Sequence, residues 1–179
     1  MTWAMMVFIV LAAALAQTWL PGMGWLGGAK CPFLMSAVLY YALGRRVSVM
    51  LVAAVAGGVM QDALSPIPFG YSAFCFVAIG LLAGAFRRLV LGESLTTQVI
   101  FGAAAAAALA MGLQLFLSGA GLLRWSFGQT VWKMAGTTLL GGVVTPLMFR
   151  AAAALDRLVG NVTEDEELRG KLDGFRWPA

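Results

Sequence analysis

Long apolar runs with almost no charge, separated by short segments rich in Gly, Pro and Arg, dominate this chain. Asp62 is the only charged residue between Arg46 and Arg87, and no charged residue lies between Glu93 and Arg124. A helix that crosses the hydrocarbon core of a bilayer needs roughly 20 mainly apolar residues. Runs of about this length cover Trp3–Leu20, Trp25–Leu43, Val47–Leu64, Tyr71–Phe86, Leu95–Leu117 and Gln129–Phe149. The pattern predicts an all-α fold, a polytopic membrane protein whose compact bundle has about six transmembrane helices and short loops.

The segments between and after these runs predict the domain boundaries. Pro and Gly residues after Leu20 and within 65–70 break the helical pattern. Pro32 is expected in the first turn of the second helix, where proline is tolerated. Tyr40 and Tyr41 near its end resemble interfacial aromatic residues. Because residues 151–179 carry six of the eight acidic residues, we expect a transmembrane domain over 1–150 and a polar cytoplasmic tail over 151–179.

Composition and charge agree with a membrane protein. The chain is 61% hydrophobic and 11% charged, whereas soluble domains carry about 25% charged residues. The net charge of +4 does not indicate nucleic acid, because the basic residues form pairs at helix ends and no stripe interleaved with aromatic residues.

The distribution of Lys and Arg predicts the orientation. Arg45, Arg46, Arg87, Arg88 and the basic tail fall on one side of a six-span bundle, which we expect to be cytoplasmic. Both termini are then cytoplasmic. A signal peptide is the alternative interpretation of the first run, but no basic side chain precedes that run.

Few residues suggest catalysis. The chain has no His, which excludes Ser-His-Asp and Cys-His nucleophilic arrangements and His-based metal sites. Cys31 and Cys75 lack metal-ligand spacing. No phosphate-binding Gly-rich loop and no paired intramembrane carboxylates are visible. We therefore expect no enzymatic activity, no metal and no cofactor.

Asp62 is the most conspicuous polar residue in the apolar runs. An ionisable side chain near membrane depth is a candidate functional group, although Asp62 could simply mark the outer end of its helix. Gly58 and Asp62 lie on one helical face, with Gln61 beside them. Lys133 begins a similar stripe in the sixth run, and we predict that Lys133 and Asp62 form an ion pair. The competing account is that each side chain reaches the interface independently.

Small residues form further stripes at helical spacing. Thr137, Gly141 and Thr145 continue the stripe that Lys133 begins, and Gly80 and Gly84 form a GxxxG pattern in the fourth run. Such stripes allow helices to approach closely. Two interpretations stay open, packing among the protein's own helices and docking of another protein's helix.

The segment from Gly57 to Gly70 (GGVMQDALSPIPFG) resembles the rod shape-determining protein MreD family, whose members carry Gly, then Asp, then Leu-Ser, then Pro-Leu-Gly. Here Pro68-Phe69-Gly70 replaces Pro-Leu-Gly. Cys31-Pro32-Phe33-Leu34 resembles the proline-led start of the family's second helix, and the tail is longer than the family implies. The residues that carry the resemblance are Gly58, Gln61, Asp62, Leu64, Ser65, Pro68 and Gly70.

The resemblance implies a non-enzymatic scaffold of the cell-elongation machinery in the bacterial inner membrane. Its implied partners are an MreC-type bitopic protein and, indirectly, MreB, RodA and a class B penicillin-binding protein. The alternative is a substrate-binding membrane component of an energy-coupling-factor-type vitamin transporter. Such a component would have a polar, outward-facing cavity lined by aromatic residues, whereas a scaffold would copurify with a single-span partner.

Overall fold

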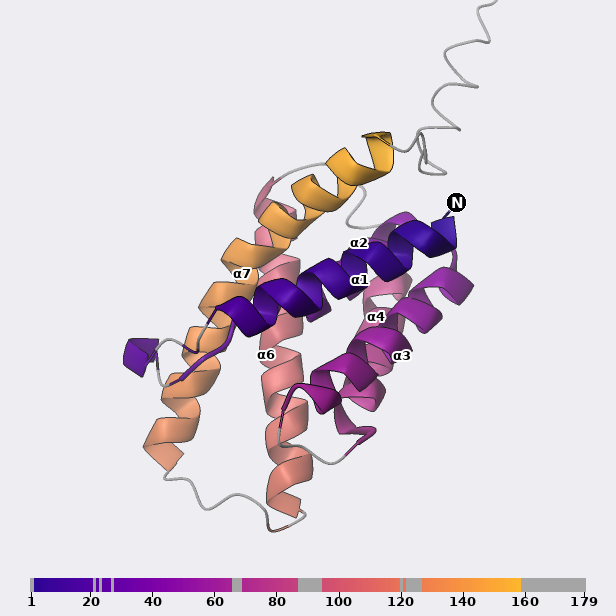
Figure 1. Cartoon of the computed structure of the whole chain (residues 1–179). Coiled ribbons are helices and arrows are strands. Elements are labelled where there is room, and N and C mark those ends of the chain that lie inside the picture. Colours follow the sequence, from indigo (N-terminus) through magenta and orange to yellow (C-terminus); the bar gives the residue numbers. More distant parts are fainter. Residues whose placement is uncertain are drawn as a thin grey trace, which may run out of the picture.

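A computed structural model shows how the apolar runs pack together (Figure 1). It describes residues 2–20, 22, 24–26, 28–65, 69–86, 95–119, 121 and 127–158. These residues form a short 3-10 helix, η1 (Gly24–Leu26), and no strand. The α-helices are α1 (Thr2–Trp19), α2 (Phe33–Gly44), α3 (Val47–Ala63), α4 (Tyr71–Ala85), α6 (Leu95–Gly119) and α7 (Phe127–Leu158). The prediction of an all-α fold is confirmed.

Two of these helices, α6 and α7, are long and apolar enough to cross a membrane, judged by length and composition. The 25 residues of α6 extend about 37 Å at 1.5 Å per residue. The other four α-helices are apolar but shorter, from 12 residues in α2 to 18 in α1. The structure thus contains two candidate membrane spans, and the six-span arrangement stays a prediction.

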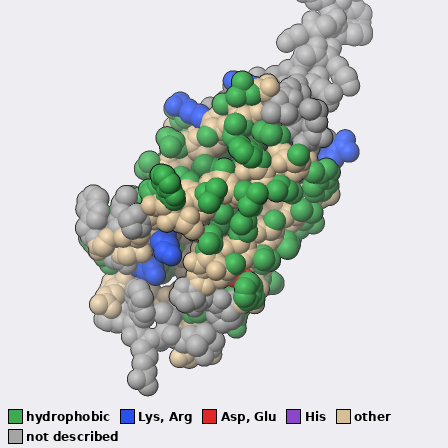
Figure 2. Space-filling view, in the orientation of Figure 1, with side chains coloured by type: hydrophobic (Ala, Val, Ile, Leu, Met, Phe, Trp, Pro, Cys, Tyr) green, Lys and Arg blue, Asp and Glu red, His purple; other side chains and the backbone are tan. Residues whose placement is uncertain are grey.

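The surface of the helix bundle is strongly apolar. Hydrophobic side chains spread over the face that includes α1 (Figure 2). On α1 the exposed residues include Phe8, Leu11 and Leu15, and on α7 they include Leu139 and Val143. Soluble proteins rarely expose contiguous apolar patches above a few hundred Å². A surface of this kind is typical of helices that face lipid.

The short helix α2 is the centre of the bundle. Ten of its twelve residues are buried, and it contacts α1, α3, α4, α6 and α7. The predicted start of this helix at Trp25 is wrong, because α2 begins at Phe33 and Pro32 is its N-cap residue. Proline has no N–H to donate and disfavours helical backbone in the residue before it. The helix therefore begins after the proline.

Helices α6 and α7 approach each other through small residues. A Cβ atom added to Gly102 would overlap Thr145, and one added to Gly141 would overlap Ala106. Thr145 in turn shares a 3.0 Å hydrogen bond with the hydroxyl of Ser36 in α2. Gly141 and Thr145 of the predicted stripe therefore pack against the protein's own helices.

Helix α7 also continues beyond the domain boundary predicted at residue 150. It ends at Leu158, and Ala152 and Asp156 in its last two turns are buried. The first part of the predicted polar tail is thus a helical part of the bundle. Residues 159–179 lie outside the described residues.

Candidate functional site

The residues that carry the family resemblance connect α3 to α4. Gly58 lies where these two helices touch, since a Cβ atom at this position would overlap the backbone of Ala73. Gly70 is the N-cap residue of α4 and has a φ of 102°, in the left-handed region that glycine adopts most readily. Both glycines are therefore required by the backbone geometry of one helical hairpin.

Asp62 holds the same hairpin closed. Its carboxylate accepts a 2.7 Å hydrogen bond from the N–H of Gly70 at Oδ2 and a 3.1 Å hydrogen bond from the N–H of Ser72 at Oδ1. The first N–H groups of a helix have no partner within the helix, and a negative charge beside them is favourable. Asp62 is only 2% exposed. Its charge is thus stabilised by the N-terminus of α4.

The predicted ion pair between Asp62 and Lys133 is not observed. Both carboxylate oxygens of Asp62 instead accept hydrogen bonds from N–H groups at the start of α4. The N–H donors of α4 lie only eight and ten residues further along the chain, so they meet Asp62 through the local turn. Lys133, in the second turn of α7, instead lines a cavity. Gln61, the neighbour of Asp62, lines that same cavity.

The other residues of the motif have different surroundings. Gln61 accepts a hydrogen bond from the side-chain amide of Gln17 in α1. Ser65 is half-buried and lines the cavity, whereas Leu64 is exposed at the end of α3. Pro68 lies outside the described residues. The motif therefore contributes a hairpin on one side and part of a cavity wall on the other.

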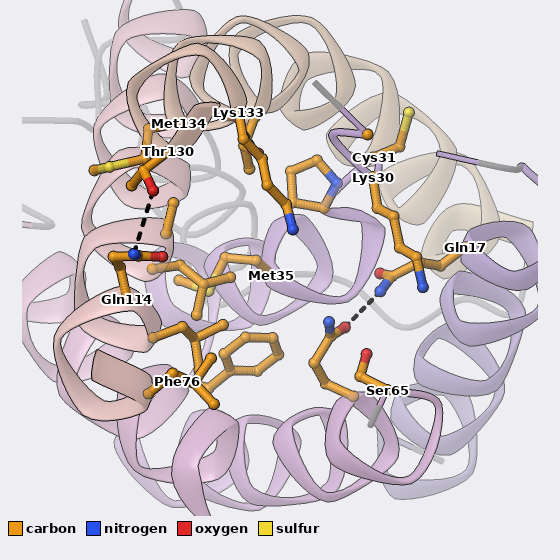
Figure 3. Close-up of a pocket in the computed structure, with 18 residues that line it drawn as sticks. Gln17, Lys30, Cys31, Met35, Ser65, Phe76, Gln114, Thr130, Lys133 and Met134 are labelled. Carbon is orange, nitrogen blue, oxygen red and sulfur yellow. Dashed lines mark hydrogen bonds between the residues drawn. The ribbon is translucent and has the colours of Figure 1, made fainter. Parts of the chain in front are cut away.

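The cavity has a volume of about 590 Å³ and lies among α1, α2, α3, α4, α6 and α7 (Figure 3). It is close to the end of the bundle where α1, α3 and α6 finish and where α2, α4 and α7 begin. This is the outer end in the predicted topology. Its lining residues are Gln17, Gly28, Lys30, Cys31, Pro32, Met35, Gln61, Ser65, Phe76, Leu109, Ala110, Leu113, Gln114, Leu117, Thr130, Lys133, Met134 and Thr137.

The polar groups of the cavity come from separate elements. Lys133 extends its amine toward the middle of the cavity, and Lys30 enters from another side (Figure 3). The side-chain amide of Gln114 in α6 donates a 3.4 Å hydrogen bond to the hydroxyl of Thr130 in α7. Gln17 and Gln114 are not among the site residues predicted from the sequence. Their signal was present, since each is an uncharged polar residue inside an apolar run.

A buried polar cluster at the opposite end of the bundle was also missed. Arg45, just after α2, forms a 3.2 Å ion pair with Asp156 of α7, and the hydroxyl of Tyr40 donates a 2.7 Å hydrogen bond to the same carboxylate oxygen. Arg45 is 8% exposed and Asp156 is 2% exposed. Tyr40 and Tyr41, which resemble interfacial aromatic residues in the sequence, are both buried among the helices. This cluster fastens the end of α7 to the central helix.

The described residues offer little for catalysis. No group of three or more His, Cys, Asp or Glu side chains within them is arranged to hold a metal ion. Cys31 and Cys75 are free and buried.

Comparison with known proteins finds no family model, no curated protein and no solved structure that matches this chain.

Proposed function

We propose that this chain is a multi-pass scaffold of the cell-elongation machinery in the bacterial inner membrane. In this role it docks an MreC-type bitopic protein and, through it, acts with MreB, RodA and a class B penicillin-binding protein. It catalyses no reaction itself. The proposal rests on the resemblance between residues 57–70 and the rod shape-determining protein MreD family.

The observation that carries the proposal is the closed α3–α4 hairpin. Gly58, Asp62 and Gly70 are residues of the family motif, and each has a defined role in this one unit. Gly58 allows the close approach of α4, Gly70 supplies the left-handed turn, and Asp62 caps the helix. Because these three residues act together in one structural unit, chance is a poor explanation for their occurrence together. This supports the family assignment.

The packing is compatible with six membrane crossings. A 12-residue helix such as α2 extends only about 18 Å, which is less than a bilayer core. Non-helical backbone is tolerated at membrane depth where it is surrounded by protein. Residues Ala29, Cys31 and Pro32, just before α2, are buried. Residues 31–32, directly before α2, can therefore extend the crossing while they are surrounded by protein.

Depletion in a rod-shaped host tests this proposal. We expect cells to become wider and round while the chemistry of peptidoglycan synthesis continues, because a scaffold positions enzymes without replacing them. The tagged chain, extracted in mild detergent, should copurify with a single-span MreC-type partner. Complementation with Gly58→Leu, which forces α3 and α4 apart, should fail, whereas Gly119→Leu should restore rod shape because nothing lies near a Cβ atom at that position. Normal shape after depletion, with no partner recovered, would contradict the proposal.

The cavity favours a second candidate function, the substrate-binding component of an energy-coupling-factor-type vitamin transporter. A cavity with several polar side chains at the predicted outer end agrees with that class. Its described lining contains one aromatic side chain, Phe76, which is fewer than the class implies. Unchanged cell shape together with lost vitamin uptake in the depleted strain would favour this candidate over the scaffold.

A further inference from the structure

The cavity at the outer end of the bundle concentrates positive charge. Lys30, which follows the turn at Gly28, and Lys133 of α7 both line it. Among its described lining residues there is no Asp or Glu. Asp62 directly follows the lining residue Gln61, but its carboxylate oxygens accept hydrogen bonds from the start of α4. The described part of the cavity wall therefore carries two cationic side chains and no carboxylate.

Two ammonium groups in one partly enclosed cavity repel each other. The repulsion is stronger than in open water, because the effective dielectric constant falls as protein replaces solvent. An anion between the two groups would replace this repulsion with charge-assisted hydrogen bonds, which are about twice as strong as neutral ones. The charge distribution thus favours an anionic occupant.

The walls divide into a polar part and an apolar part. Amide and hydroxyl groups come from Gln17, Gln61, Gln114, Ser65, Thr130 and Thr137. Apolar side chains also line the cavity, among them Met35 of α2, Phe76 of α4 and Leu113 of α6. A volume of about 590 Å³ lies within the range of roughly 300–1,000 Å³ typical of small-molecule sites. A matching occupant has a charged head and an apolar body.

We propose that this cavity binds a small amphiphilic anion. Its phosphate or carboxylate group lies between the amines of Lys30 and Lys133, and its apolar part packs against Met35, Phe76 and Leu113. Lys30 and Gly28 are exposed, so the cavity opens at the surface and admits a ligand. This inference goes beyond the proposed scaffold role and does not depend on it, because it rests on the charge and shape of the cavity alone.

Thermal unfolding of the full-length protein in a neutral detergent tests the proposal, with hexyl phosphate as the probe. Hexanol supplies the same apolar chain without charge, hexyltrimethylammonium supplies it with the opposite charge, and inorganic phosphate supplies the charge alone. We expect hexyl phosphate to raise the melting temperature in a saturable manner and to do so less at high salt. We expect the three matched compounds to have little effect at the same concentration. An equal rise with hexanol, or no rise with hexyl phosphate, would overturn the proposal.

Variants of the two lysines connect the effect to the cavity. Lys30→Gln and Lys133→Met should each weaken hexyl phosphate binding about tenfold or more, as expected for loss of one charge-assisted hydrogen bond. Arg150→Gln removes an exposed charge elsewhere on α7 and should leave binding unchanged. If Lys133→Met does not fold, Lys30→Gln still decides the question, because Lys30 lies outside the helices. Unchanged affinity in Lys30→Gln would refute the assignment.

A competition experiment distinguishes the two sources of such an anion. The protein is placed in nanodiscs of phosphatidylcholine alone or with phosphatidylglycerol, and hexyl phosphate binding is measured in both. If phosphatidylglycerol weakens apparent hexyl phosphate binding, and if Lys30→Gln abolishes this competition, a lipid headgroup is the competing ligand. Equal binding in both membranes would identify a soluble amphiphilic anion.

Discussion

Removing the charge of Asp156 should strongly destabilise the bundle. In Asp156→Asn the side chain keeps its shape and still accepts the hydrogen bond from Tyr40, but the ion pair between Arg45 and residue 156 is lost. Arg45 is 8% exposed, so water can compensate little of this loss. Breaking a buried ion pair by neutralising one partner costs about 3–5 kcal/mol. For a chain of this size, that free energy corresponds to a fall in melting temperature of about 6–20 °C.

The assay is thermal unfolding in one detergent at neutral pH, followed by the fluorescence of a thiol-reactive dye or by circular dichroism. Arg150→Gln is the matched control, since it removes an exposed charge from the same helix and should shift the melting temperature by no more than about 1–2 °C. The double variant Arg45→Met/Asp156→Asn removes both charges. It should be more stable than Asp156→Asn alone, because the buried guanidinium that lost this ion pair is then absent as well.

Two results would refute this reasoning. One is an Asp156→Asn protein that melts within about 2 °C of the Arg150→Gln control, which is less than a buried pair predicts. The other is a double variant no more stable than Asp156→Asn alone, because removing the guanidinium of Arg45 would then relieve no penalty.

Three further predictions follow from the hairpin and the topology. Gly58→Ala should lower the free energy of unfolding by about 1–3 kcal/mol, since α3 and α4 must separate to admit the new methyl group; denaturant titration measures this change. Asp62→Asn should speed amide hydrogen exchange at Ser72 and through the first turn of α4, because the helix loses a charged cap worth about 1–2 kcal/mol. In a Cys31→Ala/Cys75→Ala background, an impermeant thiol reagent outside intact cells should label Ser118→Cys and miss Ser48→Cys, because both serines are exposed but lie at opposite ends of the bundle.

Each of these predictions has a contradictory outcome. A Gly58→Ala protein as stable as the parent would mean that α3 and α4 do not touch at this position. Exchange at the start of α4 that is unchanged in Asp62→Asn would remove the capping role. Labelling of Ser48→Cys and protection of Ser118→Cys would invert the orientation inferred from the Lys and Arg distribution.

The sequence alone determined the helical architecture. Each long apolar run contains an α-helix, because a helix satisfies backbone hydrogen bonds within its own segment while its apolar side chains face apolar surroundings. The breaks near Leu20 and within 65–70 were visible for the same local reason, since Pro and Gly act on the backbone at their own positions. The start of α2 was misplaced because Pro32 stands before the helix instead of in its first turn.

Only the tertiary structure decided which polar groups meet. Asp62 is capped by backbone donors of its own hairpin and not by Lys133, and Asp156 is buried because Arg45 and Tyr40 lie beside it. These partners are between 8 and 116 residues away in the chain. The cavity likewise requires residues from six helices. Such proximity depends on how helices pack and on close contacts such as that of Gly102 with Thr145, whereas the hydrophobic pattern reports only whether a residue favours apolar surroundings.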